Sequence, residues 1–138
     1  MTTITEGAYR ISLTSSGYGD QFLTVDDQWV ALLPPDDQRP QQWNIRPCDD
    51  GYTIGQANTD TYAAYDDTPD LGEPITLTSQ PCAWTITDGP HKDTVSFGVP
   101  NIGYPPLTLG LARALVYPPR VALSPAWIGD QGWTLIPA

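Results

Sequence analysis

The amino-acid sequence predicts an all-β protein, and more specifically a β-trefoil of twelve antiparallel strands in three pseudo-repeats. Three observations lead to this prediction. First, 15 prolines and 12 glycines in 138 residues are too many for long helices, and they separate short apolar runs as turns do. Second, the apolar residues of these runs alternate with polar ones, as in strands with one buried face. Third, Trp43, Trp84 and Trp133 each begin such a run, at intervals of 41 and 49 residues.

The first unit spans about residues 7–48 and contains four alternating runs. Its expected strands are 8–12 (AYRIS), 21–25 (QFLTV), 29–33 (WVALL) and 41–45 (QQWNI). The residues expected to face inward are Tyr9, Ile11, Leu23, Val25, Val30, Leu32, Trp43 and Ile45.

The second unit, about residues 49–88, repeats this order. Its expected strands are 51–54 (GYTI), 61–65 (TYAAY), 74–77 (PITL) and 81–86 (PCAWTI), with Tyr52, Ile54, Tyr62, Ala64, Ile75, Leu77, Trp84 and Ile86 facing inward.

The third unit, about residues 91–138, has strands expected at 94–99 (TVSFGV), 107–111 (LTLGL), 120–124 (RVALS) and 131–136 (QGWTLI). Its inward residues are Val95, Phe97, Leu107, Leu109, Val121, Leu123, Trp133 and Leu135. A four-strand unit cannot bury its apolar face alone, so the three units are expected to close into a six-stranded barrel capped by three hairpins. Each tryptophan then fills core volume while its N–H finds a backbone partner.

Length and charge limit the organisation and the partners. A chain of 15.0 kDa with 40% hydrophobic residues buries one core, which predicts a single domain over residues 1–138. The net charge of −10 argues against nucleic acid and anionic membrane surfaces as partners. The first residues lack the pattern of a signal peptide, and no apolar run reaches the length of a membrane span, so we expect a cytoplasmic protein. We also expect a monomer.

Several residue types that often carry chemistry have simpler interpretations here. Cys48 and Cys82 are expected to remain free thiols, since nothing indicates secretion. The single histidine, His91, lies in the polar segment DGPHKD, where a solvated loop position is expected. No nucleophile, phosphate-binding or metal-ligand motif is present, which predicts a protein that is not an enzyme and binds no cofactor or metal.

Short patches of the chain resemble a known family. The segments GAYRIS, QQWNIRPCDDGYTI, CAWTI, AYDDTPDLGEPITL and SPAWIGDQGWTLI resemble the mycocypins and mycospins, which are β-trefoil protease inhibitors of mushrooms. The motifs Gln41-x-Trp43 and Gln131-x-Trp133 are in addition similar to the Gln-x-Trp motif of the related ricin-B-like lectins.

The resemblance to the inhibitors implies three kinds of loop. A wedge against papain-like proteases is implied for residues 15–20 and 34–41, and its members would be Gly17, Tyr18, Gly19, Pro34, Pro35 and Asp36. The same glycines and prolines are equally compatible with ordinary turns. Asn58 corresponds to an asparagine offered to the asparaginyl endopeptidase legumain, and Arg113 is the candidate P1 residue for trypsin. The alternative for the segment around Arg113 is a hairpin whose Leu115 and Val116 cap the barrel.

The resemblance to the lectins implies a different site. Their sugar sites pair the Gln-x-Trp motif with an Asp on the second strand of the unit and an Asn before the Gln. The aligned second-strand positions here are Thr24, Ala64 and Gly110, and Pro40 and Asp130 precede the two glutamines, so each expected ligand is missing. A shifted site would use Asp26, Asp27 or Asp66.

The function expected from the sequence is therefore inhibition of a protease by loops on a rigid barrel, with papain-like proteases and legumain favoured over trypsin-like enzymes. The alternative is a carbohydrate-binding lectin with a defensive role. A trefoil with another protein-binding role is the third possibility.

Overall fold

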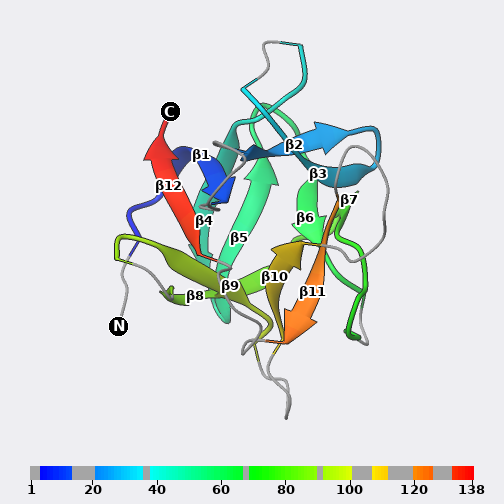
Figure 1. Cartoon of the computed structure of the whole chain (residues 1–138), viewed down its shortest axis with the longest axis vertical. Helices are drawn as coiled ribbons and strands as arrows, with labels where there is room; N and C mark the ends of the chain where they lie inside the picture. The colour runs from blue at the N-terminus through cyan, green and yellow to red at the C-terminus, as the bar shows by residue number, and fades with distance from the viewer. Residues whose placement is uncertain are drawn as a thin grey trace.

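The structure is a computed structural model that describes residues 4–13, 21–35, 38–66, 69–89, 92–100, 107–111, 120–125 and 132–138. These residues form twelve strands and no helix, so none of them belongs to a helix that crosses a membrane (Figure 1). The strands are β1 (Gly7–Leu13), β2 (Gln21–Asp26), β3 (Trp29–Leu33), β4 (Trp43–Cys48), β5 (Gly51–Gln56), β6 (Tyr62–Ala64), β7 (Thr76–Thr78), β8 (Ala83–Asp88), β9 (Val95–Gly98), β10 (Leu107–Leu111), β11 (Val121–Pro125) and β12 (Trp133–Pro137).

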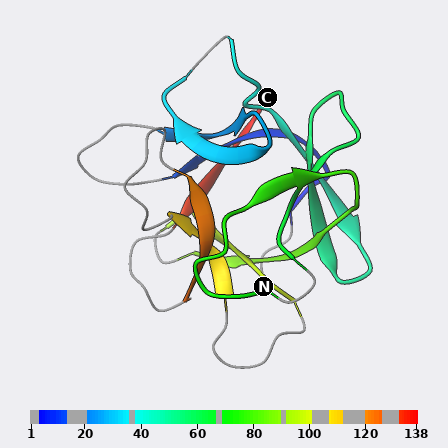
Figure 2. The same cartoon turned by 90° about the vertical axis from the view of Figure 1, so that its right-hand side faces the viewer.

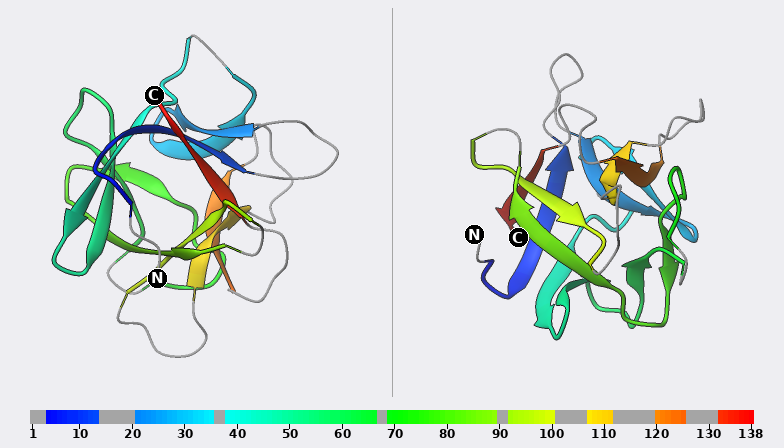
Figure 3. Two further views of the ribbon diagram at one scale, coloured as in Figure 1. Left: turned by 90° about the vertical axis from the view of Figure 1, so that its left-hand side faces the viewer. Right: turned by 90° about the horizontal axis from the view of Figure 1, so that it is seen from below.

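Six of the strands form a closed barrel. β1 pairs with β4, β4 with β5, β5 with β8, β8 with β9, β9 with β12, and β12 with β1, all of them antiparallel. The β1–β12 pairing runs from Tyr9↔Pro137 to Leu13↔Trp133 and joins the first strand to the last, which are blue and red in Figure 3. Closure leaves no barrel edge open for pairing with another chain.

The other six strands form the hairpins β2–β3, β6–β7 and β10–β11, which surround one end of the barrel (Figure 2). Every hairpin contacts the other two through the backbone. The contacts that join them are Trp29↔Thr76, Ala31↔Arg120 and Pro74↔Ala122. The predicted β-trefoil, with twelve antiparallel strands as a barrel and three caps, is therefore confirmed.

The three repeated tryptophans connect the barrel to its caps. Each lies on the closing barrel strand of its unit and is 0% exposed. Each indole N–H donates to a carbonyl on the first strand of the hairpin in the same unit. These bonds are Trp43 Nε1 to Leu23 O at 3.0 Å, Trp84 Nε1 to Ala63 O at 3.1 Å and Trp133 Nε1 to Leu109 O at 3.0 Å. A buried ring and a satisfied donor were expected of these residues, and both are found.

In β6 the residue that faces the core differs from the one expected. In β6, Ala64 is buried as predicted, but Tyr62 is only half-buried and Ala63 lies in the core instead. The physical reason is the Trp84 hydrogen bond, which requires the Ala63 carbonyl and gives this residue the place that a leucine takes in the other two hairpins. The ring of Tyr62 packs outside the core, against Gly55.

Both thiols are unpaired in the structure, as expected, with Cys48 exposed and Cys82 partly buried. Among the described residues, no group of three or more histidine, cysteine or acidic side chains is placed to hold a metal ion. His91 lies outside these residues.

Candidate functional site

The tryptophan hydrogen bonds identify equivalent positions in the three units. The residues that follow the three acceptor carbonyls are Thr24, Ala64 and Gly110, the positions that align with the sugar-binding carboxylate of ricin-B-like lectins. All three are buried, and none carries a carboxylate. The mode of sugar binding that the lectin resemblance implies therefore has no acidic ligand in any of the three units.

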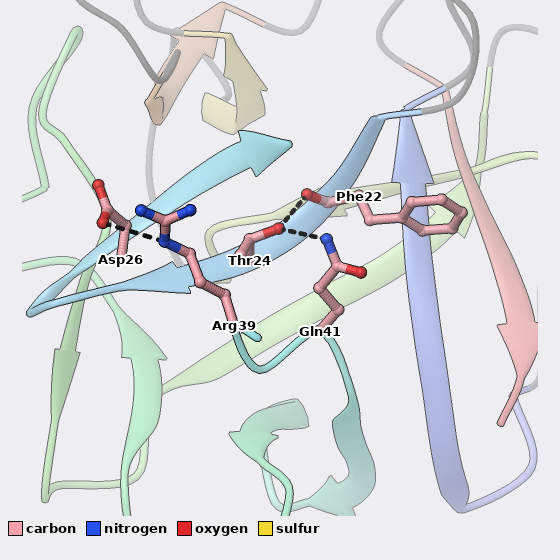
Figure 4. Close-up of polar contacts among 5 residues, drawn as sticks. All are labelled: Phe22, Thr24, Asp26, Arg39 and Gln41. Atoms are coloured by element: carbon pink, nitrogen blue, oxygen red, sulfur yellow. Dashed lines mark hydrogen bonds and ion pairs between the residues drawn. The ribbon is translucent and has the colours of Figure 1, made fainter. Parts of the chain in front are cut away.

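In the first unit, the polar side chains of Thr24 and Gln41 form hydrogen bonds within the protein (Figure 4). Gln41 Nε2 donates to Thr24 Oγ1 at 3.0 Å and to the Pro34 carbonyl at 2.9 Å, and Thr24 Oγ1 donates to the Phe22 carbonyl at 2.8 Å. Thr24 is 0% exposed and Gln41 is 6% exposed. This Gln-x-Trp glutamine thus ties β2 to the segment before β4 and has a structural role.

The carboxylates proposed for a shifted sugar site do not form one cluster. Asp26 faces Arg39, with 3.7 Å between Asp26 Oδ1 and Arg39 Nε (Figure 4). Asp27 is exposed in the β2–β3 turn at a φ of 59°. Asp66 lies after β6 on another hairpin, where its backbone N–H donates to the Glu73 carboxylate. The Asp26–Arg39 pair is open to solvent, so it adds little stability.

Most residues assigned to the inhibitory loops belong to segments that the structure does not describe. Gly17, Tyr18, Gly19, Asp36 and Arg113 all lie outside the described residues, as do Leu115 and Val116. Pro34 and Pro35 are exposed after β3, and Asn58 is exposed between β5 and β6. The structure brings Pro35 and Asn58 to the same groove, although they were assigned to loops for different proteases.

The loop between β5 and β6 is held by its own hydrogen bonds. Gln56 N–H donates to the Thr61 carbonyl at 2.9 Å, and Thr61 Oγ1 donates to Gln56 Oε1 at 2.9 Å. Thr59 Oγ1 lies 2.9 Å from Thr61 Oγ1, and Thr59 N–H donates to the Gln56 carbonyl at 3.3 Å. Asn58, at the tip, has a φ of 65°, a left-handed conformation that asparagine tolerates better than most residues. The loop therefore presents Asn58 in a preformed conformation.

Two open grooves lie on either side of this loop. The first, which we name the Arg10 groove, has a volume of about 580 Å³ and is lined by Arg10, Pro35, Pro40, Gln41, Gln42, Gln56, Ala57 and Asn58. The second, the Tyr62 groove, has a volume of about 420 Å³ and is lined by Asn44, Arg46, Thr53, Gly55, Gln56, Asn58, Thr59, Asp60 and Tyr62. Gln56 and Asn58 line both, so the two grooves share a wall.

Strand pairing builds the floor of the Tyr62 groove. Asn44 on β4 pairs with Gly55 on β5, which pairs with Tyr62 on β6, so the three residues form one row across three strands. Their neighbours Trp43 and Ile45 face the core, and alternation therefore turns Asn44 outward. Because Gly55 has no side chain, the Tyr62 ring lies over it, and a Cβ atom there would come 3.4 Å from ring atoms Cδ1 and Cε1.

The Tyr62 groove combines an aromatic ring with charged and amide groups. Arg46 and Asp60 are exposed in it, and Asn44 is half-buried. Among the described residues, Arg46 and Asp60 form no ion pair with each other or with another side chain. Their donors and acceptors are thus open to a ligand. An aromatic ring among several hydrogen-bonding groups suits a small polar molecule that has both an apolar face and polar groups.

Sequence reasoning selected Asn58 but missed Asn44, Arg46, Asp60 and Tyr62 as site residues. Tyr62 was expected in the core, and the others stand at polar positions of strands or loops that carry no motif. The register of three strands brings them together.

The whole-chain fold places this molecule among the β-trefoil proteins. No protein-family model and no curated protein sequence matches the chain. Among solved structures, it is similar to the ricin B-like lectin of Macrolepiota procera in complex with lactose, with a TM-score of 0.82, 21% identity, and coverage of 99% of this chain and 100% of the lectin. It is also similar to the Rhizoctonia solani agglutinin, with a TM-score of 0.80, 13% identity, and coverage of 100% and 99%. At these identities the likeness shows the shared fold.

Proposed function

We propose that this chain is a carbohydrate-binding β-trefoil whose sugar site is the Tyr62 groove. The observation that carries the proposal is the composition of this groove, in which the Tyr62 ring stands beside Arg46, Asp60 and Asn44, whose side chains have no polar partner within the described ranges. Sugars present apolar C–H faces and hydroxyls that both donate and accept, and the groove offers a partner for each. The fold shared with two lectins, one of them in complex with lactose, supports the proposal.

The groove also meets the energetic requirement for binding without large rearrangement. Asn44 and Tyr62 lie on paired strands, and Asn58 and Asp60 lie on or beside a loop fixed by its own hydrogen bonds. Preorganised groups lose little conformational entropy when a ligand arrives. We expect reversible binding without turnover.

The test is a glycan array followed by calorimetric titration of the sugars that bind. We expect Tyr62→Ala, which removes the ring, to weaken binding about tenfold or more, and Tyr62→Phe to retain most of it. Asp60→Asn removes a charged acceptor and should also cost about tenfold or more, because hydrogen bonds to charged groups are the stronger ones. Asp60 is exposed, so this variant tests the site without disturbing the core.

Two controls separate this site from other regions. Asp49→Asn changes an exposed carboxylate outside both grooves and should leave binding intact. Asp26→Asn tests the shifted lectin site on β2. Loss of binding in Asp26→Asn with none in Asp60→Asn would move the sugar site to the β2–β3 hairpin. Absence of any array signal would contradict the proposed function.

Protease inhibition is the second candidate, and Asn58 is the observation that favours it. This side chain is exposed at the tip of a loop with fixed geometry, as a protein that blocks asparaginyl endopeptidase requires. Titration of legumain, papain and trypsin with the purified protein distinguishes the two functions. Stoichiometric inhibition of legumain that Asn58→Ala abolishes would establish this second function.

A further inference from the structure

The Arg10 groove differs in charge from the rest of the molecule. The protein has sixteen acidic and six basic residues. Yet none of the described residues that line this groove is acidic, and Arg10 is the one basic residue among them. The remaining polar lining includes the amides of Gln42, Gln56 and Asn58, which supply N–H donors, whereas the Gln41 amide already donates to Thr24 and Pro34. In a protein of strong negative charge, this composition of the described lining favours an anion as the ligand of the groove.

Arg10 is stacked on an aromatic ring, and no residue in the described part of the chain is its counter-ion. Its guanidinium lies over the ring of Phe22, with 4.1 Å from Cζ to the ring centroid. Phe22 is itself only 4% exposed, so the ring is a rigid support. Among the described residues, Arg10 forms no ion pair. Because a stacked guanidinium still has N–H groups along its edge, Arg10 retains donors for a planar, bidentate partner.

The position of the Arg10 groove connects it to the proposed sugar site. Gln56 and Asn58 form part of both linings, so a ligand longer than one sugar is able to contact both grooves across this wall. Backbone contact steadies the wall as well, because Ala57 N–H donates to the Gln42 carbonyl at 3.1 Å. When one sugar unit of an oligosaccharide occupies the Tyr62 groove, the next sugar unit is able to cross the wall formed by Gln56 and Asn58 and reach the Arg10 groove.

We propose that the Arg10 groove binds the carboxylate of an acidic sugar, and that the ligand of this protein is an oligosaccharide containing such a residue. This inference rests on the proposed function, since it names the class of glycan that occupies the Tyr62 groove and its neighbour. Arg10 binds the carboxylate, and the amides of Gln42, Gln56 and Asn58 bind the hydroxyls of the same sugar. Carboxylate matches the guanidinium in plane and spacing, which makes the pair bidentate and charge-assisted.

The experiment compares ligands that differ only in charge. The full chain is titrated by calorimetry with trigalacturonate, with its methyl ester, and with a neutral galactose trisaccharide. A sulfated galactose trisaccharide serves as an anion of different geometry. We expect trigalacturonate to bind at least about tenfold more tightly than its methyl ester, and this ratio to fall as salt concentration rises.

The chain offers a matched control for Arg10. Arg120 also stacks on an aromatic ring, with 4.2 Å from Cζ to the Trp29 centroid, but lies on the cap outside both grooves. Arg10→Gln should reduce the affinity for trigalacturonate to that for the ester, whereas Arg120→Gln should keep the full preference. Arg10→Lys, which keeps the charge but loses the fork of donors, should give an intermediate ratio. Thermal melts establish that each variant is folded.

The outcomes separate the two proposals. Equal affinity for trigalacturonate and its ester overturns the carboxylate site, while binding of either ligand leaves the proposed function in place. A preference that survives Arg10→Gln also overturns the assignment of Arg10. If the sulfated trisaccharide binds more tightly than trigalacturonate, the preferred anion is a sulfate ester, and the proposal that the groove binds a carboxylate is wrong. No binding of any saccharide overturns both the site and the proposed function.

Discussion

At the scale of single residues, Tyr65 shows how the fold changes the chemistry of a side chain. Its ring meets Trp84 edge to face, with 5.0 Å between centroids and 87° between planes, and its hydroxyl donates to the Ala83 carbonyl. Burial raises the pKa of this hydroxyl well above its usual value, and the neighbouring Cys82 raises it further. Burial also raises the pKa of the Cys82 thiol. Both groups are therefore held neutral in the folded state.

These two shifts predict a loss of stability at alkaline pH. The folded state holds the protons more tightly than the unfolded chain, so the stabilisation is complete below the unfolded pKa values, about 8.5 for Cys and 10 for Tyr, and declines above them. We expect the free energy of unfolding, from urea titrations between pH 7 and 11, to fall above about pH 8.5. Above pH 10, Tyr65→Phe should make the fall of the unfolding free energy with pH less steep. One titrating group contributes at most about 1.4 kcal/mol per pH unit. The change should be smaller than this limit because the hydroxyl is only partly buried. A Tyr65→Phe slope identical to that of the wild type would contradict this account.

At the scale of elements, the β4–β5 hairpin depends on one glycine. Gly51 begins β5 opposite Cys48 with a φ of 146°. A Cβ atom at this position would lie 2.3 Å from the Trp84 carbonyl oxygen. The barrel strand β8 thus approaches the start of β5 so closely that no side chain fits between them.

This packing predicts different costs for two glycine substitutions. Gly51→Ala should reduce the free energy of unfolding by about 2–4 kcal/mol, because it adds a backbone clash to an unfavourable φ. The matched variant is Gly72→Ala, since Gly72 has a φ of 80° but no atom within 4 Å of its would-be Cβ. It should cost about 1 kcal/mol from φ alone. Urea unfolding followed by tryptophan fluorescence measures both, and equal costs would show that the Gly51 contact relaxes.

Elements also show why the sequence predicted the fold better than the site. Alternation of apolar residues and the spacing of the tryptophans were sufficient for all twelve strands, because both reflect burial in one repeated unit. The Tyr62 groove depends instead on register between β4, β5 and β6, which no single segment encodes. Tyr62 itself was misplaced because an aromatic residue in an alternating run resembles a core residue. Here the Trp84 hydrogen bond selects Ala63, and the tyrosine is left outside.

At the scale of the whole molecule, closure makes the three units interdependent. The barrel is complete only when β12 pairs with β1, and the hairpins support one another through contacts between every pair of units. The core is shared in the same way. Phe97 of the third unit packs near Trp133, and both belong to one cluster with Trp43 and Trp84. No unit buries its apolar face by itself.

This interdependence predicts that residues 1–138 unfold as one cooperative domain. Differential scanning calorimetry should show a single transition, with calorimetric and van't Hoff enthalpies equal, at about 100 kcal/mol at 60 °C for a chain of this length.

The variants Trp43→Phe and Trp133→Phe each leave a buried carbonyl without its indole donor and create a small cavity. Each should lower the free energy of unfolding by about 2–4 kcal/mol. Because the two residues belong to different units, each variant should lower the temperature of the whole transition. If one variant instead split the curve in two, its unit would unfold separately, and barrel closure would not couple the repeats.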